Sequence, residues 1–402
     1  MRVRSTTVRA VNGLTARWAA GTDGGTVFSA VGVWPLLALL ADGSAGAARS
    51  ELEEAVGVPA GRAAPAAREL LTGLGSVRGL ESALGLWTKR TLELRERWEA
   101  GLPADAHGVL TGDAEADGAA LDAWAAKRTG GLIERMPVRT TRDTEMVLAS
   151  ALALRTRWLK PFDEGWLTPE SGPWERRELA GLWRRSALLD RIGVADTPDG
   201  HVTELKVLGD TAVDVHLLLG EEGMTPGQVL GAGIGVLARR HPVTPGSRLP
   251  YGEAGPGVEV VRERTTRPEP PALDVTLPPY AVTSEHDLLD RPELFGLTTA
   301  VRRVPGHFPG VSSYPLHVES ARQAALARFG ARGFEAAAVT AMGAAGAGMP
   351  ELRWLHTTVQ AVFDRPFGFL AVHRHTRLVL AAGWVTDPEP FREDEDEDED
   401  QY

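Results

Sequence analysis

The spacing of hydrophobic residues changes along the chain, and the first part has the spacing of helices. Residues 28–41 are apolar nearly all round, which predicts a buried helix. Residues 50–57 and 117–128 show amphipathic spacing, and Gly57 supplies a helix stop signal. We therefore expect the chain to begin with several helices.

The later part has the spacing of strands. Alternating or continuously apolar segments predict strands at residues 203–208, 213–218, 273–282, 367–374 and 378–385. The last two are apolar on both faces and predict a buried hairpin. Pro- and Gly-rich residues 242–272 are interpreted as a surface loop. Helices followed by strands, without regular alternation, predict an α+β fold with a large mixed or antiparallel sheet.

Composition narrows the functional classes. The 402 residues include no cysteine, which excludes disulfides, thiolate metal sites and cysteine nucleophiles. The net charge is −11, but removing the eight acidic residues at 393–400 leaves −3. A near-neutral body lacks the basic face that nucleic acid binding requires, so no nucleic acid partner is expected. The acidic run is interpreted as a solubilising tail, with calcium or partner binding as the alternative.

The chain also lacks the usual targeting signals. Its basic N-terminus is not followed by an apolar stretch and a cleavage site, so we expect a cytoplasmic protein unless it uses an unconventional export route. The longest apolar run, residues 31–41, is shorter than the ~20 residues of a membrane-spanning helix. We expect a soluble monomer with no membrane partner.

Common catalytic and cofactor motifs are missing. No nucleophile elbow, His-Glu-x-x-His or phosphate loop occurs, and the glycines of residues 231–236 do not have dinucleotide-binding spacing. His373 and His375 share one strand face but have no third ligand at a metal-site spacing. Trp124, Trp158 and Trp384 lie in apolar periodic segments and are interpreted as core residues. We therefore expect no metal, no cofactor and no enzymatic activity.

Two C-terminal segments resemble the signature of the serpin family. Residues 363–372 read Phe-Asp-Arg-Pro-Phe-Gly-Phe-Leu-Ala-Val, and residues 378–388 follow with Leu-Val-Leu-Ala-Ala-Gly-Trp-Val-Thr-Asp-Pro. Other segments resemble the family in the same order: residues 28–41, 124–137, 147–162, 275–280, 287–297, 307–312 and 316–319. The resemblance covers roughly residues 26–388, leaving an N-terminal segment, 1–25, and an acidic tail, 389–402.

The resemblance implies a fold and a mechanism. It implies a large central mixed sheet with surrounding helices, a second sheet packed as a small barrel, and an exposed reactive-centre loop at about residues 331–357. In inhibitory serpins a serine protease cleaves this loop, which then inserts into the central sheet and traps the protease. The expected loop hinge consists of Gly333, Phe334, Glu335, Ala336, Ala337, Ala338, Val339 and Thr340. The small side chains of Ala336, Ala338 and Thr340 share one face, so they could enter a packed sheet without a clash.

Some residues depart from the family pattern. Phe334 stands where inhibitors usually have a small residue, and overpacking of about 1–3 kcal/mol could slow insertion. Ala331 and Arg332 replace the usual acidic pair. The resemblance places a shutter and breach, the regions that control sheet opening, at Ser29, Gly32, Ser150, Trp158 and Gln323. Of these, Gly32, Ser150 and Gln323 stand where the family normally has Ser, Asn and His.

Two spacing rules of the family place the cleavage site differently. Counting from Gly333 gives the bond Ala347–Gly348, which suits an elastase-like or subtilisin-like protease. Counting back from Asp364 gives a bond nearer Leu355, so Met349 to Leu355 stay open, and Arg353 there would attract a trypsin-like protease. The resemblance and the departures from the family pattern together leave two possible functions. One is a suicide-substrate inhibitor of a serine endopeptidase, and the other is a non-inhibitory serpin that binds a partner or has a structural role.

Overall fold

The computed structural model describes residues 1–103, 106–334 and 354–391. Its helices are α1 Ser5–Ala19, α2 Ala30–Asp42, α3 Gly46–Val56, α4 Ala60–Leu74, α5 Glu96–Glu99, α6 Ala114–Arg128, α7 Pro226–Leu237 and α8 Pro292–Phe295, with short 3-10 helices at Leu189–Arg191, Gly246–Arg248 and Leu288–Asp290. The predicted buried helix at residues 28–41 is confirmed, because every residue of α2 except Asp42 is buried.

Polar caps explain where several helices begin. Ser29 precedes α2 and its side chain accepts a hydrogen bond from the Gly32 amide. Asp113 caps α6, which therefore begins earlier than the predicted residue 117. Helix α3 likewise begins at Gly46 rather than Ser50, and it ends at Gly57 in the left-handed conformation, as the stop signal indicated.

In the described residues, the strands form three large sheets and one short pair. The five-stranded sheet has the order β15 (Tyr280–Asp287), β16 (Ser320–Phe329), β4 (Met146–Leu154), β2 (Leu80–Lys89) and β3 (His107–Leu110). The seven-stranded sheet has the order β1 (Thr26–Phe28), β20 (Leu378–Val385), β19 (Phe367–His373), β10 (Val213–Gly220), β9 (Gly200–Leu208), β8 (Ile192–Thr197) and β11 (Val243–Pro245). The six-stranded sheet has the order β12 (Gly252–Gly255), β13 (Val258–Thr265), β18 (Trp354–Val362), β14 (Ala272–Leu277), β7 (Leu179–Ser186) and β6 (Asp163–Leu167). Strands β17 (Gly333–Phe334) and β5 (Thr156–Arg157) form the short pair.

Three expectations about the strands need correction. Residues 242–272 are not one surface loop, because they contain β11, β12 and β13. The predicted strand at 273–282 is two strands in different sheets, since Pro278 and Pro279 separate β14 from β15. The expected small barrel is not closed in the described residues: the seven- and six-stranded sheets are both open.

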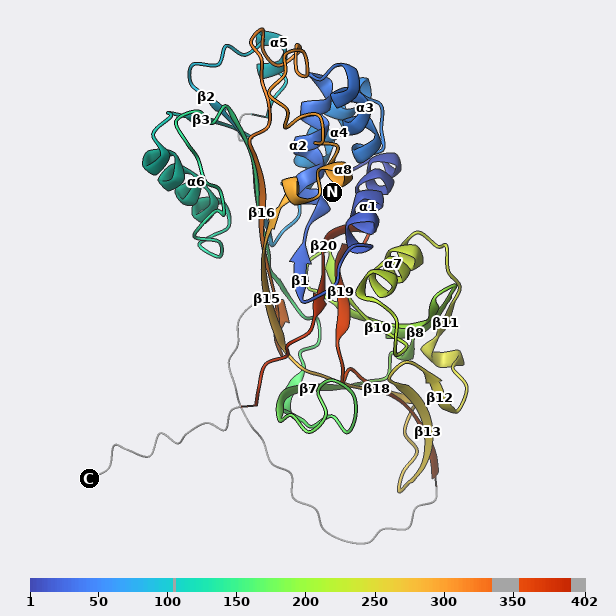
Figure 1. Cartoon of the computed structure of the whole chain (residues 1–402). Helices are drawn as coiled ribbons and strands as arrows, with labels where there is room; N and C mark the ends of the chain where they lie inside the picture. Colours follow the sequence, from blue (N-terminus) through green and yellow to red (C-terminus); the bar gives the residue numbers. More distant parts are fainter. Residues whose placement is uncertain (104–105, 335–353, 392–402) are drawn as a thin grey trace, which may run out of the picture.

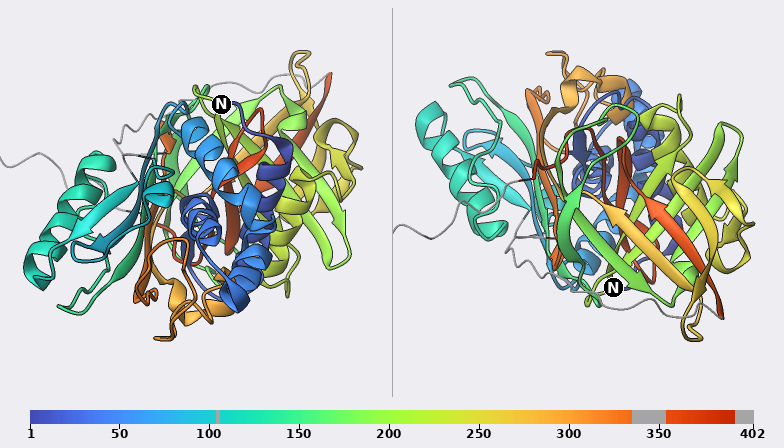
Figure 2. Two further views of the ribbon diagram at one scale, coloured as in Figure 1. Left: turned by 90° about the horizontal axis from the view of Figure 1, so that it is seen from above. Right: turned by 90° about the horizontal axis from the view of Figure 1, so that it is seen from below.

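The five-stranded sheet lies between two helical layers (Figure 1). Helix α6 covers one face, where Leu121 and Ala125 pack against Ala149 and Ala151 of β4. The other face belongs to the main core, which includes α2 and the β19–β20 hairpin. The two views of Figure 2 also show α6 apart from the other helices, on its own side of this sheet. Helix α1 contributes Val11, Leu14 and Trp18 to the main core, so residues 1–25 pack with the rest of the fold.

Candidate functional site at the seam of the five-stranded sheet

The candidate site is the boundary between β4 and β16, which we call the seam. These two strands run parallel, with pairs from Ser320–Val147 to Ala325–Leu152. We call the side near Ser320 and Met146 the far end, and the side near Phe329 and Thr156 the loop end. Because β4 and β16 are direct neighbours, the sheet has no strand between them over these pairs.

At the loop end, the chain turns back and forms the short pair of β17 with β5, which follows β4. The Gly330 amide donates a hydrogen bond to the Gly333 carbonyl, 2.9 Å away, which closes a tight turn through Ala331 and Arg332. Gly333 and Phe334 then form β17, which pairs antiparallel with Arg157 and Thr156 of β5. A Cβ on Gly333 would lie 2.4 Å from the Thr156 carbonyl oxygen, so only glycine fits this approach.

The turn itself is held by an aromatic residue and by backbone hydrogen bonds. The Trp158 indole donates to the Gly330 carbonyl at 2.9 Å, and the Trp158 amide donates to the Arg332 carbonyl at 2.9 Å. The Phe162 amide donates to the Ala331 carbonyl at 2.8 Å. Ala331 and Arg332 thus contribute through their carbonyls, which any residue could supply. This explains how the turn forms without the acidic pair that the family usually has here.

Phe334 is already inside the protein. Its side chain is 1% exposed, and its ring lies 6.2 Å from the ring of Phe369, measured between centroids. Phe329 stacks nearby on Tyr280 at 5.4 Å. The overpacking cost that we expected Phe334 to add to insertion therefore does not arise, because this ring is buried before any further residue could insert.

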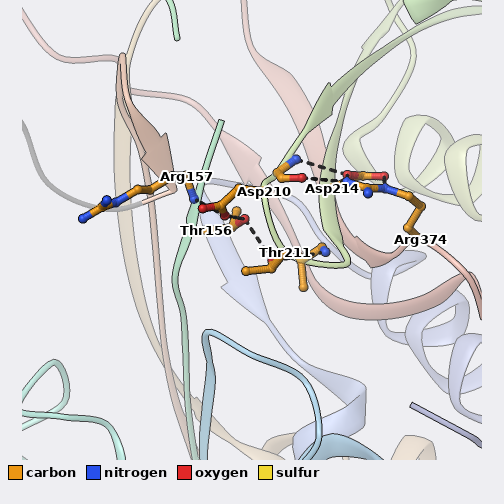
Figure 3. Close-up of polar contacts among 8 residues, drawn as sticks. Thr156, Arg157, Asp210, Thr211, Asp214 and Arg374 are labelled. Atoms are coloured by element: carbon orange, nitrogen blue, oxygen red, sulfur yellow. Dashed lines mark hydrogen bonds and ion pairs between the residues drawn. The ribbon is translucent and has the colours of Figure 1, made fainter. Parts of the chain in front are cut away.

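Strand β5 is fixed by a polar network from the loop before β10 (Figure 3). The Asp210 carboxylate accepts hydrogen bonds from the Arg157 amide at 3.2 Å and the Thr156 hydroxyl at 3.4 Å. The Thr156 hydroxyl also lies 3.1 Å from the Thr211 hydroxyl. Two charge-assisted hydrogen bonds, at 2.5 and 2.8 Å, join Arg374 to Asp214 beside this network. The network holds one wall of the position that β17 occupies.

Sequence reasoning missed Asp210, Thr211 and Thr156. Thr156 lies more than fifty residues from the neighbouring Asp210 and Thr211, and no periodic pattern links them. A weak signal was present in the turn Gly209-Asp-Thr between two predicted strands, since Asp side chains in turns commonly bind nearby backbone groups.

A buried amide occupies the middle of the seam. Gln323 of β16 is fully buried, and its side-chain amide makes two hydrogen bonds to the backbone of Ser29. It accepts from the Ser29 amide at 2.7 Å and donates to the Ser29 carbonyl at 2.8 Å. It also donates to the Ser150 hydroxyl of β4 at 3.3 Å. Gln323 thus joins β16 to the start of α2 and to β4.

Gly32 is the residue that makes room for this arrangement. A Cβ at position 32 would lie 2.5 Å from the Ser150 hydroxyl and 3.1 Å from the Gln323 side-chain nitrogen. The Ser29 hydroxyl, which caps α2, donates to the Leu380 carbonyl at 2.6 Å. The structure therefore brings Ser29, Gly32, Ser150 and Gln323 together, and the unusual residues at three of these positions fit one another.

The remaining predicted hinge and cleavage residues lie outside the described residues: Glu335, Ala336, Ala337, Ala338, Val339, Thr340, Ala347 and Gly348. The same is true of Met349 to Arg353 and of the acidic run at 393–400. Leu355, the end of the alternative cleavage range, lies in β18 and is 62% exposed.

The described part of the chain holds no group of three or more His, Asp or Glu side chains arranged to bind a metal ion. His373 and His375 contact each other, with ring centroids 5.8 Å apart, and His373 bonds to the Thr376 hydroxyl. Residues 231–236 lie inside α7, so their glycines belong to a helix rather than to a nucleotide-binding turn. No helix among the described residues has the length and hydrophobicity to cross a membrane.

Comparison with known proteins gives one consistent result. The family model described as Serpin (serine protease inhibitor) matches residues 6–171 and 258–388. The chain is 22% identical over 405 residues to a putative serpin-Z6C of Oryza sativa, covering 92% of each chain. It is also 22% identical over 325 residues to a serine proteinase inhibitor of Cavia porcellus, covering 77% of this chain and 68% of that protein.

Solved structures agree on the fold. Tengpin, a thermophilic serpin, superposes in its native state with a TM-score of 0.73 at 13% identity, covering 96% of this chain and 95% of tengpin. Human thyroxine-binding globulin superposes with a TM-score of 0.71 at 17% identity, covering 96% and 98%. These identities establish the shared architecture only. Taken with the family match, which spans most of the sequence, they show that this chain belongs to the serpin family.

Proposed function

We propose that this protein inhibits a serine endopeptidase as a suicide substrate, by cleavage of its loop and insertion of that loop between β4 and β16. One observation carries the proposal: Gly333 and Phe334 already occupy the loop end of the position that an inserted strand would fill. Starting a strand is the costly step, because ordering the first residues yields few contacts. A strand that has begun can grow by adding one pair at a time.

The registers of the two neighbouring strands support this proposal. Continuing the pairing of Phe334 with Thr156 along β5 and β4 brings Thr340 opposite Ser150. Continuing the turn that pairs Gly330 with Gly333 along β16 brings Thr340 opposite Gln323. Ser150 and Gln323 are themselves paired across the seam. Two separate extrapolations therefore give the same position for Thr340 in an inserted strand.

The chemistry at that position also fits. Side chains alternate between the two faces of a strand, so Ala336, Ala338 and Thr340 would face the main core on the same side as Phe334. An incoming Thr340 hydroxyl would meet the Ser150 hydroxyl and the Gln323 amide, the polar pair that now spans the seam. Their hydrogen bond could thus be replaced rather than lost, which lowers the cost of opening the sheet.

A non-inhibitory serpin is the second candidate. The shutter residues Gly32, Ser150 and Gln323 favour it, because they depart from the family pattern where sheet opening is controlled. Phe334 no longer favours it, since its ring is already buried. The two candidates differ in one outcome, namely whether a cleaved loop inserts.

The decisive experiment incubates the purified chain with elastase-like, subtilisin-like and trypsin-like proteases, followed by denaturing gels and mass spectrometry. We expect an SDS-stable complex, cleavage at Ala347–Gly348, and a higher melting temperature for the cleaved protein. Clean cleavage without a complex, and without a rise in melting temperature, would instead support the non-inhibitory function. Cleavage at Arg353 would move the target to a trypsin-like protease.

Two loop variants distinguish insertion from simple blocking of the protease. Ala338→Arg places a long cation at a position expected to face the core, and Ala337→Arg places it at the neighbouring outward position. We expect both variants to be cleaved, but only Ala338→Arg should lose the SDS-stable complex. Equal loss in both variants would contradict the register.

A further inference from the structure

Three side chains meet at the far end of the seam, just before its two strands begin. Glu145 precedes β4, while His317 and Glu319 precede β16. The Glu319 amide donates to the Met146 carbonyl at 3.2 Å, which is a backbone link across the seam at this end. In Figure 1 this end of β16 points toward α5, away from the loop end. A strand inserted over the full seam must separate the segments that precede β4 and β16 at this end.

His317 stands between two carboxylates. Its side chain is 9% exposed, with Nδ1 3.2 Å from Glu145 Oε2 and Nε2 4.0 Å from Glu319 Oε2. Both carboxylate oxygens are buried, and neither accepts a hydrogen bond from a described residue. A buried oxygen without a donor is costly, and one imidazole nitrogen lies near each of them.

The ring currently serves a different partner at Nε2. Arg303 Nε donates to His317 Nε2 at 3.1 Å, so this nitrogen acts as an acceptor here. Arg303 also approaches Glu319, with 3.7 Å between its Nη2 and Glu319 Oε1. The other charged groups around this hollow of about 270 Å³ are Lys89 of β2 and Asp143. Glu145, Glu319 and Arg303 are therefore the charged groups in contact with the imidazole, and Lys89 and Asp143 line the same hollow.

We propose that His317 and Glu145 form a proton-dependent clasp that holds the far end of the seam closed. When His317 takes up a proton at Nε2, it can no longer accept from Arg303, and it presents one N–H to Glu145 and one to Glu319. The contact with Glu145, which crosses the seam, then joins an imidazolium to a carboxylate and is strengthened. The guanidinium of Arg303 is released toward Glu319 and solvent.

The clasp sets the direction of a pH effect. Because the clasp requires a proton on His317, it tightens as the pH falls. The attraction between an imidazolium and a carboxylate exceeds that between a neutral imidazole and the same carboxylate, and we expect the far end to open about five-fold less often at the lower pH. This inference rests on the proposed function only for its consequence, which is slower completion of loop insertion in acid.

Hydrogen exchange of the intact chain tests the clasp without any protease. Peptides covering residues 145–150 and 318–323 are followed by mass spectrometry at pH 5.5 and 7.5, after correction for intrinsic exchange rates. In the wild type, protection at the seam should rise about five-fold at pH 5.5, while the β19–β20 hairpin should not change in parallel. In His317→Gln the rise should disappear, because glutamine cannot take up the proton.

Two further variants complete the test. Glu145→Gln keeps the shape but removes the cross-seam charge, so it should reduce the pH response even if His317→Gln folds poorly. His201→Gln is the matched control, because His201 also pairs with a glutamate, Glu221, at 2.6 Å, but at an exposed position of β9. It should keep the full wild-type response. A wild-type seam whose protection is independent of pH, or a His317→Gln variant that keeps the response, would overturn the clasp.

The outcome is separate from that of the inhibition experiment. A chain that forms no protease complex can still show the pH-dependent protection, which would leave the clasp standing and remove only its role in inhibition. Conversely, an inhibitor whose seam shows no pH response would retain the proposed function and lose the clasp.

Discussion

The loop end and the middle of the seam are held in different ways. At the loop end the short strand β17 pairs with β5, and aromatic rings from several strands pack around it. In the middle the strands still pair directly, and a single buried amide, Gln323, ties them to α2. Packing of this kind accommodates an added strand, whereas a buried hydrogen-bond network must be exchanged for another. The barrier to insertion is therefore expected in the middle of the seam rather than at its entry.

The largest expected effect comes from removing the ring at the loop end. Phe334→Ala empties a fully buried aromatic site, and such truncations typically cost about 3–5 kcal/mol of unfolding free energy. Denaturant unfolding would measure the loss. Trp166→Ala is the control, since Trp166 is 73% exposed and its loss should change stability by less than about 0.5 kcal/mol. Similar small changes in the unfolding free energy of both variants would mean that the packing of β17 contributes little to the stability of the loop end.

The next effect tests the middle of the seam. Gln323→Ala leaves the Ser29 amide buried without its partner, while the Ser29 carbonyl loses one donor but keeps the Gly32 amide, which should cost about 1–3 kcal/mol. Ser150→Ala removes only the longer bond to Gln323 and should cost less than about 1 kcal/mol. Thermal unfolding of the two variants gives the comparison. If Ser150→Ala were the more destabilising change, the main contribution of Gln323 would be its bond to β4 rather than its bonds to Ser29 at the start of α2.

A smaller effect concerns the space around the side-chain amide of Gln323. Gly32→Ala forces a methyl group toward the Ser150 hydroxyl and should destabilise the protein by about 1–2 kcal/mol, despite the better helix propensity of alanine. In a Ser150→Gly background the hydroxyl is gone, so the same substitution should become nearly neutral or stabilising. A double-mutant cycle measures this coupling. Additive effects would show that Ser150 does not determine the need for glycine.

The smallest effect returns to the loop end. Tyr280 is fully buried and its hydroxyl has no hydrogen-bond partner among the described residues, so Tyr280→Phe should stabilise the protein by about 1 kcal/mol. Burial also raises the pKa of the Tyr280 hydroxyl well above its ordinary value. The unfolded chain therefore ionises first, and the wild type should lose stability as pH rises above about 10. Tyr280→Phe should lack this part of the alkaline loss, which unfolding measurements at pH 9 and 11 would reveal.

Sequence patterns predicted the elements whose burial is uniform. Helix α2 and the β19–β20 hairpin are apolar on every face, so composition alone marked them. Strands β11 to β13 were missed because Pro and Gly lie within or between them, although β11 and β12 are edge strands, which tolerate both residues. Local periodicity therefore predicted the elements of the core. It did not predict strands in the region where turns and short strands alternate within a few residues.

The candidate site was only partly accessible to sequence reasoning. The resemblance named Ser29, Gly32, Ser150 and Gln323, but not how they bond, because the fit of a glycine to a serine on another element depends on three-dimensional spacing. Phe334 was named as an obstacle and is instead an anchor, since its burial depends on the register between β17 and β5. The contacts of Asp210 and His317 join distant segments and leave no trace in local patterns.

The tight turn from Gly330 to Gly333 has a consequence for encounters between copies of the protein. A sheet that can accept a strand can in principle accept one from another molecule. Here the protein's own strand is tethered at the opening, so its effective concentration there far exceeds that of any strand arriving from solution. A foreign strand would first have to displace Gly333 and Phe334. The turn therefore favours self-insertion over linkage of one molecule to the next.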